Sequence, residues 1–178
     1  MSVTTAFSHR LRVAHLNGRG PTDLTLEPDA AQRAAIAAQL QIQALPQLRM
    51  TARLAPAPQD AWELQGRLQA RVVQPCVVTL DPVETALDEP VHRVFSPHAA
   101  DPAAEDVEMP DPDIEPLDQT IDVGAVMVEA LALALPEYPR APGADLDAVT
   151  GDQGGDEADD TRRPFAGLAD LLARKPDS

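Results

Sequence analysis

Residues 121–140 read IDVGAVMVEALALALPEYPR, the longest apolar run in the chain that no proline interrupts before its end. Asp122 can accept hydrogen bonds from the first free amides of a helix, and two prolines end the helical pattern. Apolar residues recur at intervals of four, at Val123, Met127 and Leu131. The stretch therefore predicts a helix over 123–135 in the core of a single domain, and it is too short to span a bilayer, which needs about 20 residues.

Two alternating segments, 47–54 and 62–72, predict an antiparallel hairpin. Apolar side chains occupy every second position, and polar or charged side chains fill most of the positions between them. One face of the hairpin is then exposed to water. A turn centred near Pro58 would place Arg53 opposite Glu63 and Arg49 opposite Arg67. Opposed like charges are unfavourable unless an anionic group joins them.

The exposed face of this hairpin supplies the candidate binding residues, namely Arg49, Arg53, Arg67 and Arg71. Only Glu63 is expected nearby to balance them. Two other sources of negative charge are open, RNA phosphate and the acidic segments of the chain itself. The alternative is that the four arginines are ordinary solvated surface.

Further elements flank the hairpin. Residues 9–16 alternate like a strand, and an alanine-rich helix is expected from Pro28 to about Leu40. Two strand-like pieces at 83–87 and 91–95 are bounded by prolines. The fold class predicted is α+β, with an antiparallel sheet of about four or five strands packed with two main helices.

Acidic, proline-rich segments interrupt and follow this domain. They predict a mobile loop near 98–118 within a domain of residues 1–142, and a disordered linker at 143–162. A short amphipathic helix is expected in the tail, 163–178, with an apolar face made of Phe165, Leu168, Leu171 and Leu172. That face either docks on the protein's own core or is offered to a partner.

The net charge of −15 is distributed unevenly. Residues 1–75 carry a surplus of arginine, residues from 161 onward are also basic, and the segment between them holds nearly all the excess acid. Such a middle segment repels nucleic acid and attracts basic protein, whereas the N-terminal part favours the opposite partner.

No familiar catalytic or metal-binding motif is present. The single cysteine, Cys76, excludes an internal disulfide and a cysteine-rich zinc site, and its apolar neighbours favour a buried core residue over a nucleophile. We therefore expect no enzyme activity, no cofactor and no metal. Without an apolar signal sequence near Met1, a cytoplasmic protein that does not associate with membranes is expected.

The ordered succession of these features resembles the YceD family, the large ribosomal RNA subunit accumulation proteins. It runs from the arginine-bearing hairpin through QPCVVTLDPV, the acidic stretch and the 121–140 segment to RPFAGLADLL near the C-terminus. The resemblance covers about 28–142 and the tail. Many relatives carry a second cysteine three residues after the first, whereas this chain has Thr79 there.

The resemblance implies a non-enzymatic ribosome-biogenesis factor that supports accumulation of large-subunit (23S) ribosomal RNA. Its partner would be ribosomal RNA, held on the arginine face, or a basic large-subunit ribosomal protein, shielded by the acidic segments. An alternative from another class is a protein–protein adaptor unrelated to ribosomes, which would use the C-terminal hydrophobic helix.

Overall fold

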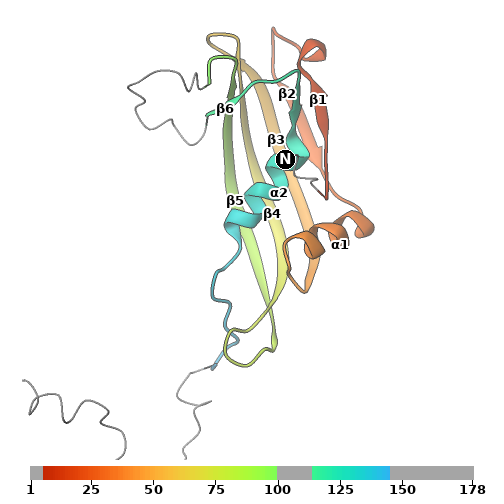
Figure 1. The fold of residues 1–178 in the computed structure, drawn as a ribbon, viewed down its shortest axis with the longest axis vertical. Coiled ribbons are helices and arrows are strands. Elements are labelled where there is room, and N and C mark those ends of the chain that lie inside the picture. The colour runs from red at the N-terminus through yellow and green to blue at the C-terminus, as the bar shows by residue number, and fades with distance from the viewer. Residues whose placement is uncertain (1–5, 100–113, 145–178) are drawn as a thin grey trace, which may run out of the picture. The chain divides into compact units, whose positions relative to one another are not determined.

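The computed structural model describes residues 6–99 and 114–144, which belong to one compact unit, residues 1–144. Figure 1 shows its strands and helices. In chain order they are β1 (Arg10–Arg12), the 3-10 helix η1 (Val13–His15), β2 (Thr22–Leu26), α1 (Ala30–Gln39), β3 (Ala44–Ala57), β4 (Ala61–Pro75), β5 (Pro82–Ser96), β6 (Ile114–Pro116), β7 (Thr120–Asp122) and α2 (Val123–Ala134). None of the helices in these residues is long and apolar enough to cross a membrane.

The main sheet has the strand order β2-β3-β4-β5-β6. Its neighbours are antiparallel except for β5 and β6, which pair in parallel, and β1 pairs with β7 in a separate small sheet. The predicted α+β class is confirmed. The two expected strand pieces at 83–87 and 91–95 are in fact one strand, β5, which Pro90 does not interrupt.

The β3–β4 hairpin forms as predicted, but the predicted register was wrong. Ala57 pairs with Ala61, so that a three-residue turn closes the hairpin, and Gln59 and Asp60 adopt positive φ angles of 62° and 58°. Arg53 therefore lies opposite Gln65, and Arg49 lies opposite Gln69. No two arginines oppose each other directly in this register. The turn is centred on Gln59 and not on Pro58. Gln59 and Asp60 adopt left-handed conformations that usually favour glycine, and no glycine marks this turn in the sequence.

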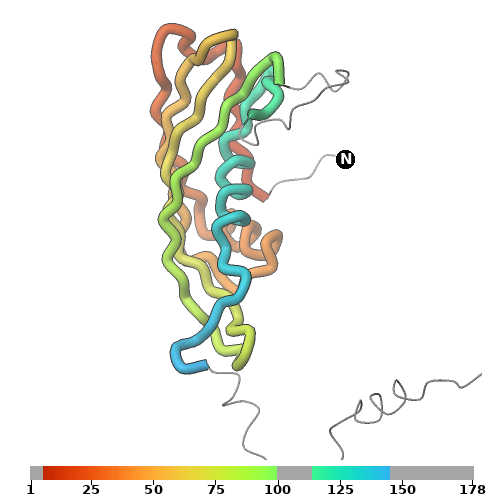
Figure 2. The backbone as a smooth tube through the Cα atoms, turned by 90° about the vertical axis from the view of Figure 1, so that its left-hand side faces the viewer, coloured from red at the N-terminus to blue at the C-terminus, as the bar shows by residue number. Residues whose placement is uncertain are grey.

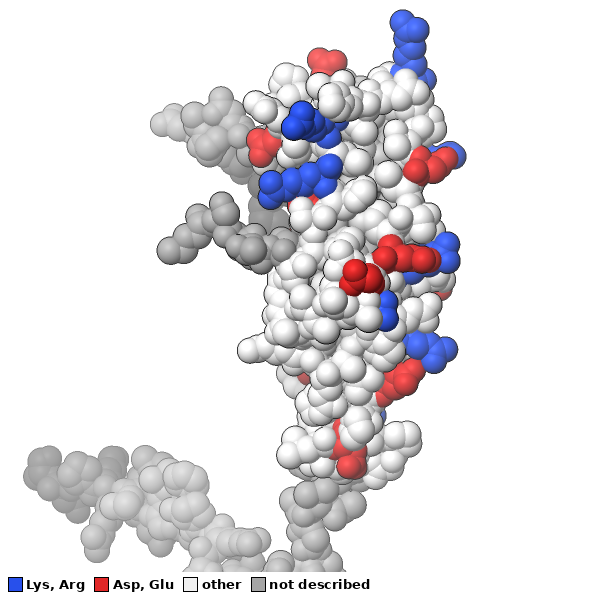
Figure 3. All heavy atoms as spheres, turned by 90° about the vertical axis from the view of Figure 1, so that its right-hand side faces the viewer, with Lys and Arg blue, Asp and Glu red and all other residues white. Residues whose placement is uncertain are grey.

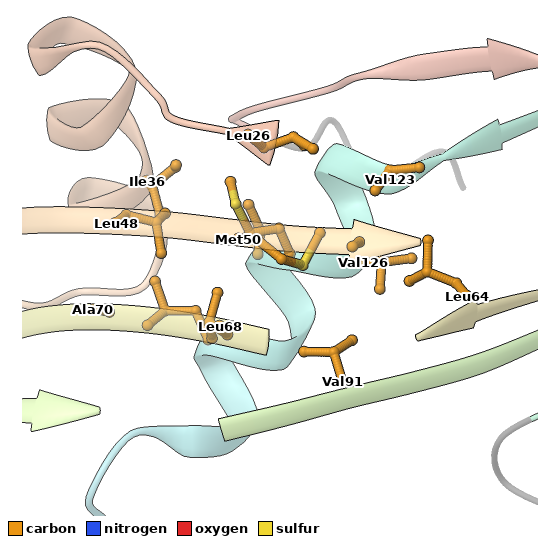
Figure 4. Close-up of a cluster of buried hydrophobic side chains, with 14 of the residues drawn as sticks. Leu26, Ile36, Leu48, Met50, Leu64, Leu68, Ala70, Val91, Val123 and Val126 are labelled. Carbon is orange, nitrogen blue, oxygen red and sulfur yellow. The ribbon is translucent and has the colours of Figure 1, made fainter. Parts of the chain in front are cut away.

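The core lies between one face of the sheet and the two helices, which Figure 2 shows on the same side of the strands. Alternate side chains of each long strand point into it, among them Met50, Leu64 and Leu68, all fully buried. Figure 4 shows these side chains meeting Ile36 of α1 and Val126 of α2. The other face of the sheet is left to solvent and carries the charged residues.

Helix α2 begins and ends close to the predicted positions, and Asp122 caps it by accepting a hydrogen bond from the Ala125 amide at 3.1 Å. Its residues Met127 and Leu131 are fully buried, as expected for a core helix. Leu133, by contrast, is 75% exposed. Apart from Glu129 the helix is therefore apolar, but it is not buried on all sides.

Helix α1 is held at its N-terminus by a reciprocal cap. The Gln32 amide donates to the Asp29 carboxylate, and the Asp29 amide donates to the Gln32 side chain, both at 2.8 Å. Pro28 lies outside the helix, not in its first turn as the sequence suggested.

The N-terminal and acidic segments differ from expectation in two places. Only residues 10–12 of the expected 9–16 strand are extended, since η1 follows them. Within the loop expected near 98–118, residues 114–116 form β6. The rest of that loop from 100 to 113, the linker beyond residue 144 and the tail helix lie outside the described residues.

Candidate interaction face

The outer face of the sheet carries the four arginines that the sequence singled out. Arg49 and Arg53 lie on β3, Arg67 and Arg71 lie on β4, and the strand alternation points all four away from the core. Their side chains are between 46% and 61% exposed. The prediction that they share one solvent face is confirmed.

Each of these arginines contacts a carboxylate on the neighbouring strand or at its end. Those of β3 are paired from the β2 side, Arg53 with Asp23 at 2.8 Å and Arg49 with Glu27 at 3.1 Å. Those of β4 are paired from β5: Arg71 with Glu84 at 3.0 Å, and Arg67 with Asp88. We call these eight residues the ion-pair face. Figure 3, viewed from the β2 side, shows basic and acidic atoms adjacent along one margin.

The pairing changes the electrostatics of this face. Hydrogen bonds from the guanidinium of Arg53 and from that of Arg67 hold the pKa of Asp23 and of Asp88 below the ordinary aspartate value. Both acids are thus ionised near neutral pH, and the eight charges sum to zero. The expectation that Glu63 alone would balance the arginines was wrong, because β2 and β5 supply the acids. Binding of RNA by these arginines stays a prediction, and phosphate would have to displace a carboxylate at each one.

Glu63 has other partners. Its carboxylate accepts a hydrogen bond from the Gln65 side chain at 2.8 Å and lies 2.9 Å from His92 Nε2 on β5. These contacts, first with Gln65 and then with His92, lower the pKa of Glu63. Glu63 therefore continues the row of polar pairs toward the turn end of the hairpin.

Asp122 does more than cap α2. Besides the Ala125 amide, its carboxylate accepts hydrogen bonds from the Ser8 hydroxyl, the His9 amide at 2.8 Å and the Arg10 guanidinium at 3.4 Å. Burial alone would raise the pKa of Asp122, but these hydrogen bonds outweigh it and lower the pKa. The carboxylate thus ties the start of the described chain to the start of α2. The sequence showed only the cap, because nothing local places residues 8–10 beside it.

Arg93 joins three elements on the inner side of β5. Its guanidinium donates to Glu115 of β6 at 3.1 Å and to Glu129 of α2 at 3.0 Å, and its side chain is only 15% exposed. Burial, followed by repulsion from Glu129, raises the pKa of Glu115. This three-residue cluster was missed by the sequence, since its members are 22 and 36 residues apart along the chain.

Cys76 is buried, as predicted, but its surroundings are polar. Its sulfur accepts the backbone amides of Val78, Thr79 and Ala141, each at 3.4 Å. The Thr79 side chain, followed by the Ala141 and Thr79 amides, lowers the pKa of the thiol to about 6. Cys76 therefore packs beneath the 76–80 turn as a hydrogen-bond acceptor and lies outside the main hydrophobic cluster.

Two further predictions concern a metal site, which was not expected, and a docking helix in the tail. In residues 6–99 and 114–144 no group of three or more His, Cys, Asp or Glu side chains is placed to hold a metal ion. The predicted docking residues Phe165, Leu168, Leu171 and Leu172 lie outside the described residues.

A family model described as "Large ribosomal RNA subunit accumulation protein YceD" matches residues 64–172, more than half of the chain. The chain belongs to the YceD family. The match begins within β4, so the resemblance at 28–63 is not part of it. No curated protein and no solved structure matches the chain.

The matched range divides the predicted binding residues of this YceD-family chain. It contains Arg67 and Arg71 together with Glu84 and Asp88, their partners on β5. Arg49 and Arg53 lie before it. The YceD match thus includes α2, β5 and the β4 half of the ion-pair face, and excludes the β3 half.

Proposed function

We propose that this protein is a non-enzymatic factor of ribosome biogenesis that supports accumulation of large-subunit (23S) ribosomal RNA in the cytoplasm. It would act by binding a basic ribosomal protein of the large subunit. Membership of the YceD family carries the proposal, since the family description names that process.

Charge supports a protein partner over RNA. The described residues contain ten arginines and fourteen acidic residues, and the four arginines of the ion-pair face each contact a carboxylate. Residues 100–113, which join β5 to β6, add six acids and no base. Protein surfaces of one sign attract partners of the other sign and repel like charge, so phosphate is disfavoured and a basic protein is favoured.

The test of the function is the ribosome profile of a deletion strain. We expect a selective deficit of large subunits and of 23S RNA in a sucrose gradient, restored by the full-length protein expressed from a plasmid. Growth loss with an unchanged ratio of large to small subunits would instead favour the adaptor alternative and reject this proposal.

The class of partner is tested separately with the purified full-length protein. Binding to 23S RNA fragments and to isolated basic large-subunit proteins is measured in the same buffers. We expect binding to the proteins and little to the RNA. Tight RNA binding that the parent loses when all four arginines of the ion-pair face become glutamine would reverse the assignment.

A further inference from the structure

Strand β5 has a long open edge. It has 15 residues and pairs with β4 from Pro82 to Phe95, whereas on its other side β6 pairs only with residues 94–96. Among the described residues no strand covers β5 from 82 to 93. Figure 2 looks onto this edge, where β5 is the strand nearest the viewer and α2 runs beside it.

Two observations show which backbone groups face outward. Pro90 and Pro82 lack an amide hydrogen, so they can sit in this strand only where that hydrogen would point away from β4. The carbonyl oxygen of His92 accepts the side chain of Arg93 at 2.9 Å, which places it on the same side. Because direction alternates along a strand, the amide and carbonyl groups of Glu84, Ala86 and Asp88 also face outward.

A groove lies next to this edge. It is formed between β5 and the last turns of α2, and its lining combines the apolar Val91, Leu133 and Ala134 with the charged Glu89 and Arg93. Leu133 is the most exposed large apolar side chain among the described residues. A strand added to β5 would place alternate side chains over this groove, while its backbone paired with the edge.

The charges around the edge select the partner. Glu89 is exposed beside the groove and has no ion pair within 4.0 Å among the described residues, and Glu115 and Glu129 share the single Arg93. On the outer side, Glu84 and Asp88 are matched by Arg71 and Arg67. The surplus is therefore negative. Proline and charged residues on an edge also oppose indiscriminate pairing with apolar strands.

We infer that the open edge of β5, with the groove at Leu133, receives an extended basic segment of a protein partner as an added strand. The inference rests on the proposed function and specifies how the basic ribosomal protein is held. Lysine or arginine side chains would face Glu89 and Glu129, and apolar side chains would cover Leu133.

The edge is probed with synthetic peptides of about ten residues, the length of a long strand. One carries both lysine and valine on the side that would meet the groove, and a control has glutamate in place of lysine. Amide hydrogen exchange of the full-length protein is followed by NMR. We expect Glu84, Ala86 and Asp88 to exchange fast in the free protein and to become protected with the basic peptide only, whereas Thr85 and Leu87 are protected throughout.

Two variants and one matched control test the geometry. Ala86→Pro removes an outward amide without touching the β4 ladder and should weaken binding of the basic peptide about tenfold. Ala86→Val keeps the amide and should bind within about twofold of the parent. Leu133→Gln, at an exposed position, removes the apolar contact without adding charge and should weaken binding without loss of fold even if Ala86→Pro does not fold.

Several results would overturn the inference. One is parent-like binding by folded Ala86→Pro or by Leu133→Gln. A second is protection that maps to another surface, and a third is protection of the three edge amides in the free protein that rises with its concentration. The last result would mean that a second copy occupies the edge. A strain that loses large subunits while the edge binds no basic peptide would reject this inference and leave the proposed function standing.

Discussion

Gly124 allows the segment at residues 8 and 9 to lie against the first turn of α2. A Cβ at this position would come within 2.5 Å of the His9 nitrogen and 2.8 Å of the Ser8 carbonyl carbon. Alanine favours an isolated helix over glycine by about 1 kcal/mol. Gly124→Ala should nevertheless destabilise the protein by about 2 kcal/mol, because backbone atoms must move to make room.

Chemical denaturation measures this effect, with Ala132→Gly as the matched control. Ala132 is exposed near the end of the same helix, so its replacement reports helix propensity alone, about 1 kcal/mol destabilising. A Gly124→Ala protein more stable than the parent would show that residues 8 and 9 do not pack there.

The Asp122 carboxylate should be worth more than an ordinary helix cap. Asp122→Ala removes the acceptor for Ser8, His9, Arg10 and Ala125 together, and we expect a loss of about 2–3 kcal/mol in the free energy of unfolding. Asp122→Asn keeps one acceptor oxygen and should lose less. Faster amide exchange at residues 9–12 would accompany the loss, and equal stability of the alanine variant and the parent would contradict this account.

Cys76 should make stability depend on pH. Its pKa of about 6 in the folded protein lies below the ordinary value of about 8.5 for an unfolded thiol. A lowered pKa means that the folded state favours the thiolate. The stabilisation is therefore complete above about pH 8.5 and is lost as the pH falls through about 6.

The unfolding free energies of the parent and Cys76→Ala should accordingly diverge between about pH 6 and 9, with the parent gaining as the pH rises. Absorbance of the thiolate at the ultraviolet edge gives the pKa independently. Parallel stability curves would show that the thiol does not ionise at the lowered value. Accumulation of large subunits should be unaffected by the substitution.

At the scale of elements, the ion-pair face is a group of arginines whose charges are neutralised by carboxylates on neighbouring strands or at their ends. Its four arginines lie on two adjacent strands, yet carboxylates from the β2 side and from β5 neutralise them. Exposed pairs of this kind contribute little to stability. Changing all four arginines to glutamine should therefore leave the circular dichroism spectrum unchanged, and it should not alter RNA binding, which we expect to be weak in the parent.

The reciprocal variant gives the sharper test. Changing Asp23, Glu27, Glu84 and Asp88 to their amides leaves four unmatched arginines on the face. Affinity for single-stranded RNA at low salt should rise, and the slope of log affinity against log salt should steepen by up to about 0.7 for each additional phosphate that the face binds. Unchanged RNA binding would mean that the arginines are too far apart, or too constrained, to reach phosphate.

At the scale of the whole molecule, the net charge of −15 predicts how the protein meets its partner. Association with an isolated basic large-subunit protein should be fast at low salt and should slow steeply as ionic strength rises, because screening removes the long-range attraction. Stopped-flow or surface plasmon resonance measurements across a salt series provide the rates. An association rate independent of salt would show that charge does not guide the encounter.

Local rules were sufficient for much of the fold. The cap at Asp122, the span of α2, the β3–β4 hairpin and the shared face of its four arginines follow from residues that are near in sequence. Each depends on periodicity, on a capping side chain or on a chain-breaking proline, all of which act within one or two turns or one strand.

Only the tertiary structure decided what those arginines face. Asp23 and Arg53 are 30 residues apart, and Arg67 and Asp88 are 21 apart, so neither pair has a local signal. The same holds for Arg93 between Glu115 and Glu129, and for the open edge of β5. Which strands become neighbours is set by burying all apolar faces at once, and charge pairing across strands and the exposure of an edge are consequences of that global packing.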